Sequence, residues 1–261
     1  AGNENKELYY LPDDERKSKK KLYIAQGSEK GFGIPYAHGI NDVVLEENPN
    51  FLQVVSCNTH NIASLIKTLA PDPTRLHWAD FTCIRRANDI SQNGSFIASP
   101  DVGKHKYSSF GTHHAKDAYD LFRTMYQCPN IFSSALKINT QYMHVIRFHM
   151  QVRDYATEKD VLDKLEENKF VALTHKTLAN KVFSFGRDHG YYGRIFNHTV
   201  VSLPSIVTGR MNGMTTITGF CFTPQDGNSL LSSVAAALHA IHGESSTKYM
   251  KYFDSYLYND I

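Results

Sequence analysis

A single cysteine stands where an apolar segment gives way to a polar one, and its thiol is the strongest candidate for covalent chemistry. Cys57 follows Val54 and Val55 and precedes Asn58 and Thr59. Apolar residues then recur at helical spacing, which predicts that the thiol lies at the amino end of a helix. The unsatisfied N–H groups there favour a thiolate, so the position is typical of a nucleophile. A small buried cysteine at a strand end is the competing interpretation.

A histidine farther along the chain is the candidate base for this thiol. Residues 145–152 alternate between apolar and polar, which predicts a strand covered on one face, and His144 opens it in phase with the apolar side. An imidazole near the thiol can take the sulfur proton and later deliver a proton to an oxyanion at neutral pH. A hydrogen-bonded core histidine is the alternative interpretation.

Two basic pairs are candidates for binding phosphate. Arg85 and Arg86 end a strand predicted over 76–84, and His113 and His114 begin a predicted helix. A guanidinium binds phosphate oxygens at two points, and a helix N-terminus supplies N–H groups and a positive dipole. Together they predict a site for a phosphorylated small molecule.

Composition narrows the classes of function. Lys and Arg number 28 against 26 Asp and Glu, so the overall charge does not indicate a polyanionic partner. The basic run Arg16–Lys21 could contact nucleic acid, although such runs are more often solvated surface. The four cysteines lack metal-ligand spacing and no apolar run is long enough to cross a bilayer. We therefore expect a cytoplasmic protein with no metal site and no membrane contact.

The order of predicted elements indicates an α+β fold in which one largely antiparallel sheet is faced by helices. Helices are expected from residue 58, from residue 113, after a capping box formed by Thr157 and Asp160, over 230–241, and in the tail. Strands are expected at 22–25, 76–84, 145–152, 169–174, 181–185, 198–207 and 214–222. Residues 87–111 are expected to form a long loop.

The chemistry-bearing residues follow one another in an order that resembles a known family. The segments that carry the resemblance are Gln26-Gly27-Ser28-Glu29-Lys30, Val54 to Thr59, Arg85 to Asp89, Thr112-His113-His114 and Met143-His144. They resemble type II, archaeal, glyceraldehyde-3-phosphate dehydrogenase. The resemblance covers most of the chain, and its specific part lies between Gln26 and Val152.

This resemblance implies a role for each candidate. Cys57 would attack an aldehyde carbon to form a thiohemiacetal, which becomes a thioester once hydride leaves to NAD or NADP, and His144 would be the base. The sheet would support a homo-oligomer or a larger assembly. The groups that would bind phosphate or line the thiol's pocket are Arg85, Arg86, His113, His114, Asn58 and Thr59.

Two features depart from the family pattern. The family has Asn-Thr-Thr-Gly after the cysteine, whereas here His60 and Asn61 follow Thr59, which puts the pocket shape in question. In addition, no stretch supplies the glycine-rich turn of a dinucleotide-binding unit. We therefore expect no cofactor to bind this chain alone. Three explanations account for the missing nucleotide-binding half: a separate chain supplies it, this chain is a fragment of a longer protein, or that half has been lost.

The expected organisation follows from this resemblance. Residues 1–56 would be a lead segment with a remnant of a Rossmann-type domain, 57–243 a catalytic-type α+β domain like the family's C-terminal domain, and 244–261 a helical tail. The function would be the catalytic portion of an NAD(P)-dependent phosphorylating aldehyde dehydrogenase. A redox-inactive structural or interaction subunit is the alternative, and hydrolysis of a thioester or acyl phosphate by the thiol is a third hypothesis.

Overall fold

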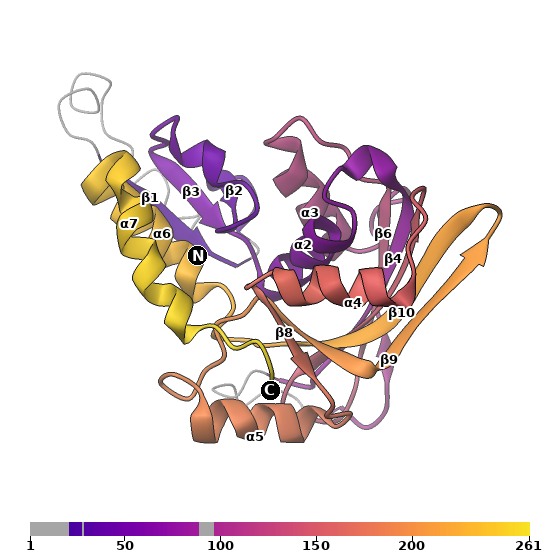
Figure 1. The fold of residues 1–261 in the computed structure, drawn as a ribbon. Coiled ribbons are helices and arrows are strands. Elements are labelled where there is room, and N and C mark those ends of the chain that lie inside the picture. The colour runs from indigo at the N-terminus through magenta and orange to yellow at the C-terminus, as the bar shows by residue number, and fades with distance from the viewer. Residues whose placement is uncertain (1–20, 28, 89–96) are drawn as a thin grey trace.

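The computed structural model describes residues 21–27, 29–88 and 97–261. Most of the basic run at 16–21 therefore lies outside the described residues, as do Ser28 and Asp89 of the family-like segments. Figure 1 shows a large sheet with helices on one face and a small sheet on the far side of those helices. In the described part of the chain, no helix is both long enough and apolar enough to span a bilayer.

The large sheet has seven strands among the described residues, and it is mixed. Four neighbouring pairs are antiparallel, whereas β4 with β6 and β8 with β9 are parallel. Antiparallel pairing thus predominates, in agreement with the expected sheet. In spatial order the strands are β5 (Asp101–Val102), β6 (Ile131–Lys137), β4 (Leu76–Arg85), β7 (His144–Val152), β10 (Met214–Thr223), β9 (Thr199–Met211) and β8 (Val171–Thr174).

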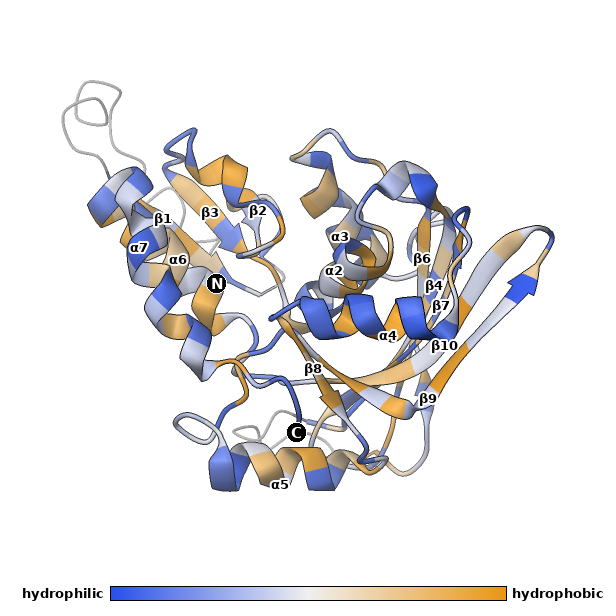
Figure 2. Cartoon of the chain, in the orientation of Figure 1, coloured by the Kyte–Doolittle hydropathy of each residue, from blue (hydrophilic) through white to orange (hydrophobic). Residues whose placement is uncertain are grey.

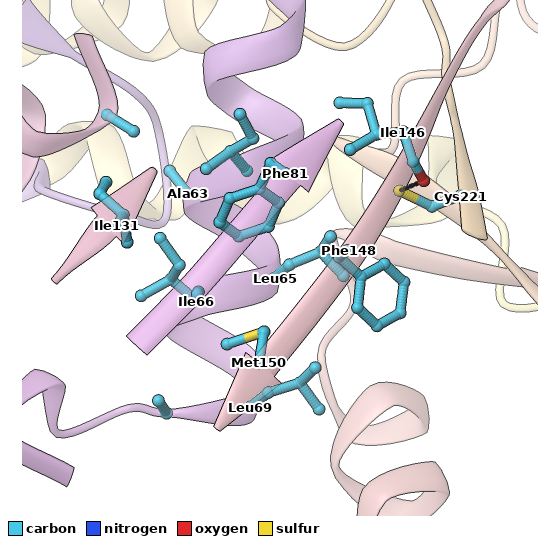
Figure 3. Packing of buried hydrophobic residues seen from close by; sticks show 14 of the residues in the cluster. Ala63, Leu65, Ile66, Leu69, Phe81, Ile131, Ile146, Phe148, Met150 and Cys221 are labelled. Atoms are coloured by element: carbon cyan, nitrogen blue, oxygen red, sulfur yellow. Dashed lines mark hydrogen bonds between the residues drawn. The ribbon is translucent and has the colours of Figure 1, made fainter. Parts of the chain in front are cut away.

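Three amphipathic helices cover one face of this sheet: α2 (Cys57–Leu69), α3 (His113–Arg123) and α4 (Glu158–Glu167). Figure 3 shows Leu65 and Ile66 of α2 packed near Phe81 and Phe148 of the sheet. Burial of these apolar side chains is the main force that joins the two layers. Figure 2 shows hydrophilic residues along the exposed side of α4.

The predicted starts of the three helices are confirmed. Cys57 is the first residue of α2, and His113 is the first residue of α3. The capping box at the start of α4 is also present: the Thr157 backbone N–H donates to the Asp160 carboxylate at 2.7 Å, and the Asp160 N–H donates to the Thr157 hydroxyl at 3.2 Å.

The small sheet is all parallel, with the order β1 (Tyr23–Gln26), β3 (Phe51–Val54) and β2 (Ile34–Tyr36). Two C-terminal helices, α6 (Leu230–His242) and α7 (Ser246–Met250), share its apolar core, in which Leu52 and Val54 cluster with Leu231 and Met250. Figure 1 shows these yellow helices beside β1. The division at 56 and 243 stays a prediction, but the core of the small sheet includes residues from both sides of each boundary.

One predicted strand is wrong, because residues 181–185 belong to a helix, α5 (Ala179–His189). The aromatic and β-branched residues there favoured a strand. The buried positions of α5 are Val182 and Gly186, four residues apart, as in a helix with one covered side. Sequence analysis also missed β6, which pairs in parallel with β4 and has no regular alternation of apolar and polar residues.

Candidate functional site

Six of the eight predicted site residues line one pocket of about 470 Å³: Cys57, Asn58, Arg85, His113, His114 and His144. The pocket lies where the carboxyl ends of β1 and β3 meet the large sheet. Since β4 and β7 are antiparallel, the end of β4 at Arg85 lies beside the start of β7 at His144. The topology therefore gathers residues that are up to 87 positions apart in the sequence, the interval from Cys57 to His144.

Cys57 is a half-buried thiol at the first position of α2. Its helix carries no side-chain N-cap, because the Ser56 hydroxyl instead contacts the Thr59 hydroxyl at 2.9 Å. The Cys57 carbonyl accepts a hydrogen bond from the Asn228 amide at 2.9 Å, which fixes the backbone at this point. The thiol thus faces the pocket beside the positive end of the α2 dipole.

The remaining cysteines lie elsewhere. Cys83 and Cys221 are buried in the core, and burial raises the pKa of both thiols, that of Cys221 to about 12. Cys128 is exposed and does not line the pocket. Among the four cysteines, Cys57 is therefore the one suited to react with a bound ligand.

Three helix N-termini converge on the pocket. They belong to α2 at Cys57, α3 at His113 and α6 at Leu230, and in none of the three does the side chain of the N-cap residue accept a capping hydrogen bond. The exposed Arg85 adds a full positive charge. Free N–H groups and aligned dipoles favour an anion, so the pocket is suited to phosphate or a developing oxyanion.

The two histidines at the start of α3 are held neutral at pH 7. Burial lowers the pKa of His113, and it lowers the pKa of His114 further below its usual value. Within the described residues, neither ring nitrogen of His114 has a hydrogen-bond partner, although the ring borders the pocket. Both nitrogens are themselves buried, so they are unsatisfied polar atoms beside the pocket and not exposed ligand-binding groups.

Ser133 of β6 positions this end of α3, a role that sequence analysis missed. Its buried hydroxyl accepts a hydrogen bond from the Ala115 N–H at 3.0 Å and contacts the Thr112 hydroxyl at 2.7 Å. The sequence gives no signal for this contact, since it depends on the parallel pairing of β6 with β4.

Both ring nitrogens of His144 have hydrogen-bond contacts among the described residues. The backbone N–H of Arg86 donates to Nδ1 at 3.0 Å, and the side-chain amide of Gln225 lies 2.8 Å from Nε2. Gln225 also lines the pocket but was not among the predicted residues. Gln225 lies in the loop that follows β10, and it contacts His144 because β10 pairs with β7.

Two predicted residues do not line the pocket. Thr59 is fully buried and its hydroxyl is used locally. Arg86 is also buried, and its guanidinium donates to the Tyr142 carbonyl at 2.9 Å. Side chains of adjacent residues in an extended backbone point to opposite sides, so Arg85 faces the pocket while Arg86 faces away from it.

The two residues that depart from the family pattern also lie away from the pocket. His60 is buried and contacts the Ser56 carbonyl through Nδ1 and the Ser232 hydroxyl through Nε2, at 3.1 and 2.8 Å. Asn61 donates to the Thr223 hydroxyl at 2.9 Å. They join α2 to α6 and β10, so the expected change in pocket shape does not come from their side chains.

The described residues do not fit a dinucleotide. Within them, β3 leads directly into α2, and Val55 and Ser56, followed by Cys57 at the helix start, stand where a Rossmann unit has its glycine-rich phosphate turn. The described residues likewise contain no group of three or more His, Cys, Asp or Glu arranged to hold a metal ion.

Comparison with known proteins relates the chain to glyceraldehyde-3-phosphate dehydrogenases of archaea. It is 26% identical to that of Sulfolobus acidocaldarius over 210 residues, 72% of this chain and 57% of the relative. It is 28% identical to the Picrophilus torridus enzyme over 179 residues and 27% identical to the Pyrococcus furiosus enzyme over 180 residues. Each of these two alignments covers 67% of this chain. They cover 48% of the Picrophilus torridus enzyme and 47% of the Pyrococcus furiosus enzyme. The chain thus spans about half the length of the curated relatives it matches. No family model matches the sequence.

Proposed function

We propose that this chain carries the thiol chemistry of a phosphorylating aldehyde dehydrogenase of the glyceraldehyde-3-phosphate dehydrogenase type. The observation that supports the proposal is the single pocket in which Cys57, His144 and the anion-binding groups lie together. The similarity to archaeal enzymes of that name adds independent support.

In the proposed reaction, the Cys57 thiolate attacks the carbonyl carbon of an aldehyde. A carbon–sulfur bond forms, the π electrons of the carbonyl move to its oxygen, and that oxygen takes up a proton to give a thiohemiacetal. Arg85 and the N-termini of α2, α3 and α6 bind the substrate's phosphate and orient the aldehyde.

Oxidation of that adduct requires a hydride acceptor. The relatives imply that the family uses NAD or NADP, and the described residues offer no site that fits either one. We propose that residues outside those described, or a second chain, hold the nucleotide. The small parallel sheet would then be what this chain retains of a Rossmann-type domain.

A redox-inactive structural or interaction subunit is the second candidate function. The poor fit of the described residues to a dinucleotide favours it. Under this alternative Cys57 would have no enhanced reactivity, so the state of the thiol separates the two proposals.

The test is the rate at which iodoacetamide modifies each cysteine near neutral pH, followed by mass spectrometry of the native protein. We expect Cys57 to react at least tenfold faster than the exposed Cys128, and inorganic phosphate to slow only the reaction of Cys57. A Cys128→Ser variant provides a clean background for the measurement. Equal, slow modification of Cys57 and Cys128, unaffected by phosphate, would support the interaction subunit instead.

A further inference from the structure

We propose that Lys30, which follows β1, compensates the buried negative charge of Asp117 and so keeps the start of α3 receptive to an anion. Neither residue is among those that line the pocket. Lys30 acts on a bound phosphate through Asp117 and α3, which makes it a positioning residue. The inference rests on the proposed function, because it assumes that the pocket binds an anion.

The first step of the argument concerns Asp117. It lies four residues after His113, one turn along α3, and its side chain is only 9% exposed. Water screens a charge at such a place poorly. A carboxylate within the helix whose N-terminus borders the pocket therefore weakens anion binding there, unless a cation offsets its charge.

The second step concerns Lys30, which supplies that cation. Its Nζ lies 3.0 Å from a carboxylate oxygen of Asp117 and donates a hydrogen bond to the Tyr107 hydroxyl, also at 3.0 Å. Partial burial lowers the pKa of Lys30, but the contacts with Tyr107 and Asp117 outweigh this effect and raise the pKa above its usual value. Lys30 is therefore charged at neutral pH.

The ion pair also joins two walls of the pocket. Lys30 lies three residues after Gly27, which lines the pocket beside the small sheet, whereas His113 lines it from α3. Tyr107 belongs to the loop that leads into α3, and its carbonyl accepts a hydrogen bond from the Gly111 N–H at 2.7 Å. Lys30 thus contacts both the helix and the loop that precedes it.

The third step concerns His113, whose protonation depends on the same charges. Burial lowers the pKa of His113, the charge of Asp117 raises it, and the charge of Lys30 lowers it. Without Lys30, the uncompensated carboxylate would draw a proton onto His113 or take one up itself as the pH falls. The charged and titratable groups that face His113 or Asp117 are Lys30, Arg85, Lys106, His114 and Asp120.

The test is the protection of Cys57 from iodoacetamide by inorganic sulfate, which stays a divalent anion throughout the pH range used. The quantity measured is the sulfate concentration that halves the alkylation rate. At about pH 8 we expect Lys30→Met to raise it about fivefold or more, and Lys30→Arg to restore most of the protection. No change in Lys30→Met would contradict the proposal. Lys116→Met is the matched control, since Lys116 pairs with the more exposed Asp120 on the same helix, and its effect should stay within about twofold.

Two further variants separate compensation from direct attraction of the anion by Lys30. Lys30→Met combined with Asp117→Asn should bring the sulfate concentration back to within about threefold of the unaltered protein. Asp117→Asn alone should bind sulfate at least as tightly as the unaltered protein, and this result does not depend on whether Lys30→Met folds. A double variant as poorly protected as Lys30→Met, or a tenfold loss in Asp117→Asn, would overturn the inference.

The pH profile is a readout that a merely structural contact would not move. In Lys30→Met, protonation of Asp117 or His113 removes the uncompensated charge, so sulfate protection should recover between about pH 8 and pH 6. The unaltered protein should change less over this range, because its Asp117 is already compensated. Parallel profiles in the two proteins would count against compensation.

NMR of protein labelled with ¹⁵N-histidine follows His113 directly, and a His113→Gln variant assigns its signals. We expect Lys30→Met to raise the pKa of His113 and Asp117→Asn to lower it, because the first removes a repelling charge and the second an attracting one. Shifts of the same sign in both variants, or none, would refute the charge balance. Opposite shifts in a protein whose Cys57 is unreactive would refute the proposed function but leave the compensation intact.

Discussion

Arg85 and Arg86 are adjacent, yet the backbone gives them different tasks. Arg85 is exposed at the pocket, whereas the Arg86 side chain is buried against the Tyr142 carbonyl and its backbone N–H holds the His144 ring. A sequence motif of two arginines thus combines a ligand-binding group with a structural one. Arg85 is therefore the candidate ligand-binding group, and Arg86 provides a matched control.

We predict that Arg85→Gln weakens the protection of Cys57 by inorganic phosphate about tenfold or more, since a charged hydrogen bond contributes roughly 1.5–3 kcal/mol. Protection is measured as the phosphate concentration that halves the rate of alkylation. Arg86→Gln should leave this concentration within about threefold but lower the free energy of unfolding by roughly 2 kcal/mol, because it disrupts a buried hydrogen bond. The same loss of protection in both variants would contradict this division of roles.

The site residues that could be predicted from the sequence are those placed by the start of their own helix or strand. Cys57 and His113 stand at helix starts, and His144 stands at a strand start, so the local pattern places them. Gln225 and Ser133 were missed because their roles come from strand pairing across the large sheet. No periodicity within their own segments carries that information.

At the scale of elements, a helix-capping motif is the sequence feature that predicts structure most dependably. The box formed by Thr157 and Asp160 is visible as a motif and fixes the start of α4. In contrast, α5 has an intrinsic preference for strand that its packing overrides. Val182 belongs to an apolar cluster with Ala172 and Ile195, and the buried residues Val182 and Gly186 lie about one helical turn apart on the covered side of α5.

We predict that Thr157→Ala lowers the free energy of unfolding by about 1 kcal/mol, because it removes the acceptor for the Asp160 N–H. Urea unfolding followed by circular dichroism measures the change. Thr177→Ala is the control, since Thr177 is exposed and lies outside any described helix or strand. Its effect should stay within about 0.5 kcal/mol. Equal effects of the two substitutions would show that the cap contributes nothing.

At the scale of the whole molecule, α2 and α6 join the large sheet to the small one through a buried polar junction. The Ser232 hydroxyl accepts a hydrogen bond from the His38 N–H at 2.9 Å and lies 2.8 Å from Nε2 of His60. His198 packs against this junction. Its ring centroid lies 5.1 Å from that of His60 and 4.5 Å from that of Phe170, on which the His198 ring stacks. The sequence showed His60 as a departure from the family pattern, but its role appears only where the two parts of the fold meet.

This junction makes stability depend on pH. Burial lowers the pKa of His60 from 6.5 to about 4, and it also lowers the pKa of His198. In the unfolded chain His60 binds a proton below about pH 6.5, whereas in the native state it stays neutral down to about pH 4. The unfolded state therefore holds more protons within this window, and the free energy of unfolding falls as pH decreases through it.

We predict that His60 alone lowers the free energy of unfolding by up to about 3 kcal/mol between pH 6.5 and pH 4, at 1.36 kcal/mol for each unit of pKa difference. Urea unfolding at several pH values measures the slope in the unaltered protein and in His60→Gln. The variant is less stable at pH 7, because the contact with Ser232 is altered, but its slope below pH 6.5 is shallower. Carboxylates contribute to both slopes, so the difference between the two isolates His60. Parallel slopes would mean that His60 does not change its protonation on unfolding, and the junction would then be linked to pH through other groups.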